Sequence, residues 1–131
     1  MPEISPSDVA PPAADYAHAV LTTSPTRWLH TSGVVPAEPD GSVPDGIGEQ
    51  ADVVWSNIAA MLRDARMSVT DIVSVTTYVV ADHLDDLGSV MTARDRALDG
   101  HRAASTLVTV PALAHPEWKM EIAVVAASSS P

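Results

Sequence analysis

Residues 69–82, VTDIVSVTTYVVAD, decide the fold because they form a long segment with strong preference for extended backbone. Valine, threonine and tyrosine fit the pleated surface of a sheet better than they fit a helix. The side chains alternate between one face, with Val73, Val75 and Val79, and a second face, with Ile72, Thr76, Tyr78 and Val80. This pattern predicts a strand whose two faces are both substantially covered.

Helical periodicity flanks this strand on both sides. Between residues 45 and 66, apolar side chains recur every three or four positions, which is typical of an amphipathic helix of about five turns. A Pro/Gly/Asp-rich loop over 36–46 precedes it. A second apolar stripe covers 83–98, and Asp82 is placed to cap that helix.

The remaining segments with strand composition are 17–22, 27–35, 105–113 and 118–126. The first two are separated by a short turn, and we expect them to pair with each other. The resulting order is β-β-α-β-α-β-β. It predicts an α+β fold with one mixed sheet and both helices packed on one face.

Residues 1–131 are expected to form a single domain, with an N-terminal arm over 1–14 and a frayed tail over 127–131. Two helices can cover only one face of the sheet, yet the strand at 69–82 is apolar on both. Such a sheet usually buries its second face against another subunit. We therefore expect an oligomer.

Composition excludes several classes of function. Seventeen acidic residues against seven basic ones give a net charge of −10, which repels nucleic-acid phosphates, so we expect no nucleic-acid partner. The chain has no cysteine, and its histidines lack zinc-binding spacing, so we expect no metal. There is no export signal and no apolar run of about 18 residues, which predicts a cytoplasmic protein without membrane contact.

Glu121 interrupts an otherwise apolar run in the last predicted strand, and two interpretations of it stay open. The carboxylate could lie on a solvated strand face and pair with Lys119, two positions earlier on the same side. An exposed pair of this kind contributes about 0–1 kcal/mol. Alternatively, a cleft holds the carboxylate, and partial desolvation lets it give and take protons near neutral pH.

Five tracts in this order resemble the Rid family, also called YjgF/YER057c/UK114. The likeness spans residues 12–127, and the Q-x(6)-N spacing of Gln50 and Asn57 is among its more distinctive parts. The tracts are DYAHAV (15–20), HTSGVVP (30–36), GIGEQADVVWSNIAAMLRDA (46–65), VTDIVSVTTYVVAD (69–82) and STLVTVPALAHPEWKMEIAVVA (105–126).

The resemblance implies a chorismate-mutase-like fold assembled as a homotrimer, with clefts between neighbouring subunits that accept a small-molecule metabolite. Family members hydrolyse enamines and imines, released by pyridoxal-phosphate enzymes, to a 2-oxo acid and ammonia. They do so without a metal or cofactor, so none is expected here. An endoribonuclease activity is also attributed to the family.

Four residues match the family's site. Glu121 takes the place of the glutamate that positions the attacking water, and Tyr16 that of a tyrosine in the pocket. Ser32 and Gly33 match a Ser-Gly pair. On the residues alone, Tyr16 could equally anchor the N-terminal arm, and Gly33 could equally form a β-bulge.

The family's carboxylate-binding arginine has no counterpart, because Ser105 stands at its position. A serine hydroxyl offers one neutral donor, whereas an arginine offers two parallel charged ones. Arg102, three residues earlier, is a candidate substitute, and its alternative is a solvated loop residue. This sequence resembles the branches of the family that lack the arginine.

Three functions follow as hypotheses. The first is cofactor-independent hydrolysis (deamination) or tautomerisation of a small enamine or imine, with Glu121 as acid/base and Tyr16, Ser32, Gly33, Ser105 and Arg102 as substrate-binding residues. The second is a non-catalytic trimer of the same fold that binds a small ligand. The third, an endoribonuclease, is disfavoured by the net charge of −10.

Overall fold

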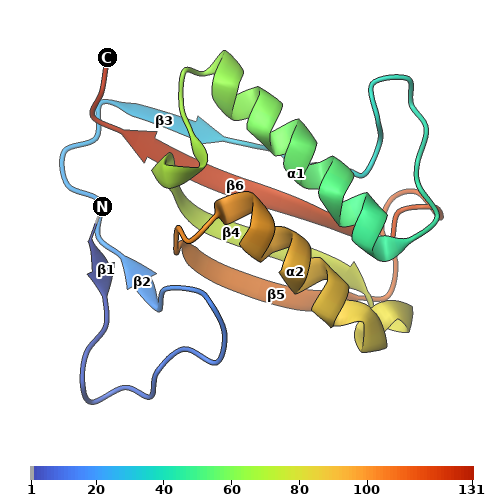
Figure 1. Ribbon diagram of the computed structural model, residues 1–131, viewed down its shortest axis with the longest axis horizontal. Coiled ribbons are helices and arrows are strands. Elements are labelled where there is room, and N and C mark those ends of the chain that lie inside the picture. Colours follow the sequence, from blue (N-terminus) through green and yellow to red (C-terminus); the bar gives the residue numbers. More distant parts are fainter. Residues whose placement is uncertain (1) are drawn as a thin grey trace.

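Four strands form one mixed sheet in the order β3-β6-β4-β5 (Figure 1). The computed structural model describes residues 2–131. The strands are β3 (Arg27–His30), β4 (Ile72–Val80), β5 (Ala104–Val110) and β6 (Met120–Ser128). β4 and β5 run parallel, whereas β6 is antiparallel to both of its neighbours, β3 and β4. The last strand in the chain thus joins β3 to the rest of the sheet.

Both helices, α1 (Ile47–Asp64) and α2 (Leu87–Leu98), cover the same face of the sheet (Figure 1). α1 buries side chains at three- and four-residue steps, and these pack with buried residues of β4 and β6 in one core. The main members are Ala51, Val54, Ile58, Leu62, Val75, Val79, Met120 and Ile122. The predicted α+β architecture, one mixed sheet with two helices on one face, is confirmed.

The opposite face of the sheet has no helix over it, and we call it the open face (Figure 1). Strand alternation assigns side chains to it: on β6, Met120 and Ile122 are fully buried beneath the helices, and Glu121 between them points the other way. Paired residues share a face. From the register, the open face also carries Trp28, His30, Thr76, Tyr78, Thr106, Val108, Ala123 and Val125.

A register shift between Ile72 and Ser74 changes the alternation in β4. Ile72 is 1% exposed and belongs to the core beneath the helices. The prediction that Ile72 shares a face with Tyr78 is therefore wrong. An irregularity of this kind adds a residue to one strand and moves the preceding side chain to the other face.

The N-terminal strands pair differently from the prediction. β2 (Ala19–Val20) is two residues long and pairs with β1 (Glu3–Ile4), which lies inside the segment predicted to be an arm. The expected pairing of 17–22 with 27–35 is wrong, because all four residues of β3 pair with β6 instead. Pairing with β6 places β3 beside the apolar core, whereas pairing with the two-residue strand β2 would not.

Two boundaries also shift. Ala81–Asp86 form a 3-10 helix, η2, so Asp86 rather than Asp82 occupies the N-cap position of α2. An N-cap precedes the first α-helical turn, and η2 moves that turn towards the C-terminus. β6 continues through Ser128, so Ala127 and Ser128, predicted to be frayed, are buried strand residues.

Candidate functional site

Glu121 lies on the open face, directly opposite Tyr78 of β4. A pocket of about 310 Å³ surrounds its side chain and is lined by Gly33, Tyr78, Leu113, Glu121 and Ala123. We call this the Glu121 pocket. Its side chains supply one carboxylate and one phenol, and the others are apolar. A small, largely apolar pocket with few polar groups is typical of a small-molecule site.

Gly33 has no side chain, and the carboxylate of Glu121 occupies the space where one would lie. A Cβ atom on residue 33 would stand 1.6 Å from Oε2 and 2.8 Å from Cδ of Glu121. Unbonded heavy atoms do not approach so closely, so a side chain at position 33 and this position of the carboxylate exclude each other. Glycine permits this close approach because it has no Cβ.

Residues 31–33, between β3 and the loop over 36–46, form a bulge beside β6. The pairs His30–Val125 and Val34–Ile122 enclose it, and between them this segment has one residue more than β6 has. The Ser-Gly pair forms the last two residues of this bulge, as one of its two interpretations predicts.

Ser32 is exposed and lines a neighbouring pocket of about 400 Å³, formed by residues 29–35, Ala37, and Asn57 and Met61 of α1. Gly33 lines both pockets. Ser32 therefore adjoins the Glu121 pocket and does not line it.

No cation of residues 2–131 pairs with the carboxylate of Glu121. The Nζ of Lys119 donates instead to the backbone carbonyl of Asp45. Lys119 precedes the first residue of β6, so strand alternation does not hold its side chain beside Glu121. Within residues 2–131, Glu121 and Lys119 therefore form no ion pair.

Tyr16 and Arg102 meet each other at the β5 edge of the sheet. Arg102 donates to the backbone carbonyl of Tyr16 at 2.6 Å and forms ion pairs with Glu3 at 3.0 Å and Asp15 at 3.1 Å. The phenol oxygen of Tyr16 accepts a bond from the N–H of Ala13 at 3.3 Å. Within one chain, these groups hold the N-terminal segment against β5.

Ser105 lies in β5, in register with Val75 of β4. Val75 is 1% exposed and faces the helices, so Ser105 is on the helix-covered side of the sheet. Within one chain, the structure brings Glu121 and Gly33 together, places Ser32 next to them, and leaves Tyr16, Arg102 and Ser105 on the β5 side.

Three residues of the Glu121 pocket were not predicted from the sequence: Tyr78, Leu113 and Ala123. Tyr78 could have been found from pairing, because it lies opposite Glu121 once β4 and β6 are adjacent. Leu113 gives no such signal, since it follows β5 in an irregular segment.

Gln50 and Asn57 of α1 hold the loops that border the site. The side chain of Gln50 is 1% exposed; its Nε2 donates to the carbonyls of Pro44 (2.8 Å) and Glu117 (2.9 Å), and its Oε1 accepts from the N–H of Lys119 (2.9 Å). Asn57 donates to the carbonyl of Ala37 at 2.9 Å. These bonds fix the approach to β6 and the segment that follows the bulge.

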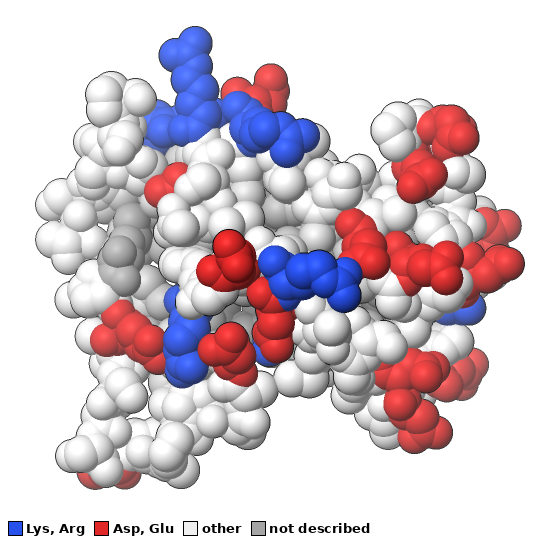
Figure 2. Space-filling view, viewed as in Figure 1, with Lys and Arg blue, Asp and Glu red and all other residues white. Residues whose placement is uncertain are grey.

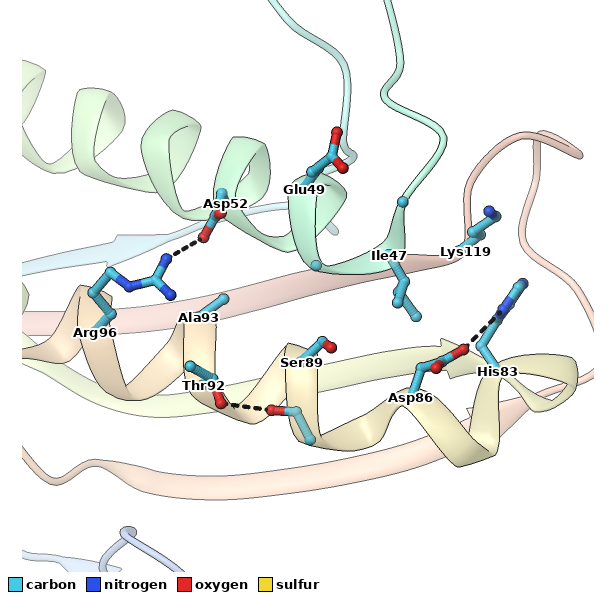
Figure 3. Close-up of a pocket in the computed structure, with 13 residues that line it drawn as sticks. Ile47, Glu49, Asp52, His83, Asp86, Ser89, Thr92, Ala93, Arg96 and Lys119 are labelled. Carbon is cyan, nitrogen blue, oxygen red and sulfur yellow. Dashed lines mark hydrogen bonds and ion pairs between the residues drawn. The ribbon is translucent and has the colours of Figure 1, made fainter.

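A larger pocket, of about 970 Å³, lies elsewhere, between the start of α1 and α2 on the helix-covered side. Figure 3 shows two charged pairs among its lining residues: Arg96 of α2 with Asp52 of α1, and His83 with Asp86 of the same segment, η2. The paired atoms are 3.0 Å and 3.8 Å apart, respectively. None of the predicted site residues lines it. We therefore do not assign the reaction to it.

Acidic side chains are spread over much of the helix-covered face (Figure 2). Some basic side chains lie next to one another at the upper edge of the view, and others lie among acidic ones, as in the pair of Arg96 with Asp52. Among residues 2–131, no three histidine or acidic side chains come together as metal ligands, and no helix is long and apolar enough to cross a bilayer.

Known structures share this fold over almost the whole chain. A protein of the conserved Rid family, YyfB from Yersinia pestis, is 28% identical, with a TM-score of 0.87 over 96% of this chain and 97% of that one. YjgF from Escherichia coli is 26% identical, with a TM-score of 0.71 over 97% and 98%. TdcF from E. coli, crystallised with bound serine, is 24% identical, with a TM-score of 0.73 over 98% and 100%.

A family model shows the relationship more directly. The model described as Endoribonuclease L-PSP matches residues 7–128, which includes every element from β2 to β6. No curated protein matches the chain. The chain therefore belongs to the Endoribonuclease L-PSP family, the family also known as Rid or YjgF/YER057c/UK114.

Proposed function

We propose that this protein hydrolyses, and so deaminates, or tautomerises a small enamine or imine in clefts between the subunits of a homotrimer. One observation supports this most: the carboxylate of Glu121, which no cation of residues 2–131 pairs with, lies over Gly33 in a small, largely apolar pocket on the open face. TdcF, which shares the fold, was crystallised with serine bound, so the fold can accommodate a ligand of amino-acid size.

A carboxylate at this position can carry the proton transfers of the hydrolysis. As the water oxygen bonds to the C=N carbon, Glu121 takes a proton from the water and the C=N electron pair moves to nitrogen. The protonated Glu121 returns this proton to nitrogen, which gives a carbinolamine. Glu121 then takes the hydroxyl proton and passes it to nitrogen, so that the C–N bond breaks and ammonia leaves as the carbon forms its C=O bond. Tautomerisation needs the same transfers between nitrogen and carbon, without water.

In this proposal a neighbouring copy completes the pocket. Tyr16, Ser105 and Arg102 lie on the β5 side, and within one chain β4 separates them from Glu121 on β6. Another copy that meets the open face could bring Tyr16 and Arg102 close to it, whereas the side chain of Ser105 is on the helix-covered side of its sheet. The open face also exposes apolar side chains, with Trp28 at 50% and Val108 at 39%, which favours contact between copies through this face.

Val108→Asp is expected to dissociate the homotrimer, because it places a charge in an apolar contact where the charge would lose its hydration. Light scattering coupled to size-exclusion chromatography would show the mass fall from three chains to one. Leu84→Asp is the matched control: Leu84 is 57% exposed but belongs to η2, away from the open face. A wild-type mass of one chain would contradict the proposed assembly.

Glu121→Gln is expected to lower the rate of hydrolysis at least about 100-fold, because the amide keeps the shape of the side chain but transfers no proton at neutral pH. The assay follows ammonia and carbonyl product from imines and enamines with a carboxylate, such as 2-aminoacrylate and 2-iminobutanoate, and from others without one. Glu117→Gln, in the exposed turn before β6, controls for the lost charge. A Glu121→Gln variant with wild-type rates would rule out the assigned role.

The non-catalytic binder is the second candidate, favoured by how few groups in the Glu121 pocket can move a proton. A wild-type protein that binds a small ligand, accelerates none of these reactions and keeps its affinity in Glu121→Gln would establish it. The endoribonuclease remains disfavoured because a net charge of −10 opposes RNA binding.

A further inference from the structure

We infer that the Glu121 pocket selects an uncharged or positively charged substrate that carries no carboxylate. This inference rests on the proposed function and narrows the class of enamine or imine that the protein accepts. It follows from where the chain places its seven lysine and arginine side chains.

Four of the seven belong to the helices or their ends. Arg63 and Arg66 lie at the end of α1, and Arg94 and Arg96 lie on α2. Arg94 is 6% exposed and pairs with Asp95, and Arg96 pairs with Asp52. All four are on the helix-covered side, with the sheet between them and Glu121.

The other three are held by backbone or acidic groups. Arg27 donates to the carbonyls of Ala65 at 2.6 Å and Arg66 at 3.2 Å, so it caps the end of α1. Lys119 donates to the carbonyl of Asp45. Arg102, described above, lies between Glu3 and Asp15.

The open face itself carries no lysine or arginine among the paired residues of β3 to β6. Copies that meet through this face therefore add no such cation to the Glu121 pocket. Arg102 could enter only from an edge, and it would bring Glu3 and Asp15, two carboxylates for one guanidinium. The assembled pocket stays negative with or without Arg102.

The negative charge of the Glu121 pocket determines which substrate groups it can bind. A substrate carboxylate near Glu121 would meet a like charge in a partly desolvated site, which is unfavourable. An amine, amidine or iminium nitrogen would instead meet a charge-assisted hydrogen-bond acceptor. Tyr78 and the apolar side chains of Leu113 and Ala123 suit a short hydrocarbon or aromatic substituent.

Three probes of the same shape and different charge test the inference: benzamidine (cation), benzamide (neutral) and benzoate (anion). Affinities are measured on the intact assembly at pH 8 and at about 150 mM salt, which screens distant charges. The backbone amide signals of Gly33 and Ala123 in NMR spectra report binding in the Glu121 pocket.

We expect benzamidine to shift these two signals and to bind at least tenfold more tightly than benzoate. Glu121→Gln should weaken benzamidine at least tenfold and reduce its preference over benzoate, whereas Glu117→Gln should change neither. Equal or tighter binding of benzoate, absence of shifts at Gly33 and Ala123, or an unchanged affinity for benzamidine in Glu121→Gln would overturn the inference.

The outcome is separable from that of the proposed function, because the probes do not react. Charge selection without turnover of any imine would uphold the inference and contradict the enzymatic proposal. Efficient turnover of 2-iminobutanoate, together with no preference among the three probes, would uphold the enzyme and overturn the inference.

Discussion

Gly33→Ala is expected to reduce activity at least about 100-fold while leaving the protein folded. The new Cβ would stand 1.6 Å from Oε2 of Glu121, so the carboxylate has to leave its position. The carboxylate is the far end of a flexible side chain, so it can rotate away at a modest cost in free energy. The proton-transfer group then no longer faces the substrate. Rates from the imine assay and urea unfolding of the same preparation would separate lost chemistry from lost stability.

Gly88→Ala is the control for this substitution. A Cβ on Gly88 of α2 meets no atom within 4 Å, and the position is helical, so the variant should be fully active and no less stable. Wild-type activity in Gly33→Ala would show that the carboxylate acts from another position. The interpretation of the Gly33–Glu121 contact would then be wrong.

Gln50→Ala should be the most destabilising of these substitutions, by about 3 kcal/mol or more in the free energy of unfolding. It removes the partners of three backbone groups, the carbonyls of Pro44 and Glu117 and the N–H of Lys119. A buried polar group left without a partner costs about 1–3 kcal/mol. Activity should fall too, because the turn that leads to Glu121 loses its support.

Urea unfolding at one protein concentration measures the effect, since an oligomer's stability depends on concentration. Glu49→Ala, the exposed neighbour on α1, is the control and should change stability little. A loss below about 1 kcal/mol in Gln50→Ala would mean that water replaces all three bonds.

Periodicity was sufficient to predict the layers of the fold. The apolar stripe of α1 and the apolar alternation of β6 both arise because these side chains are buried between the helices and the sheet. Burial of this kind produces a periodic pattern in the sequence. Periodicity was insufficient where one irregular residue moves a side chain to the other face of the sheet, as at Ile72. It was also insufficient where a short strand has two potential partners, as for β2 and β3. Local composition does not encode such long-range choices.

The candidate site, like the fold, could be predicted only in part. Glu121 stands out in the sequence because it is a charge in an apolar strand, and Gly33 because glycine is uncommon there. Tyr78 looks like an ordinary strand residue until β4 and β6 are known to be neighbours. The spatial separation of Ser105 from Glu121 likewise depends on the register of β5, which no motif specifies.

The position of β6 bears on how the protein is synthesised. β3, more than forty residues before β4 in the sequence, has no partner in the four-stranded sheet until residues 120–128 leave the ribosome, because β6 must insert between them. β4 and β5 can pair earlier, with an apolar edge exposed in the meantime. Nascent chains therefore pass through a stage that favours aggregation and chaperone capture, and that stage ends when the final strand is added.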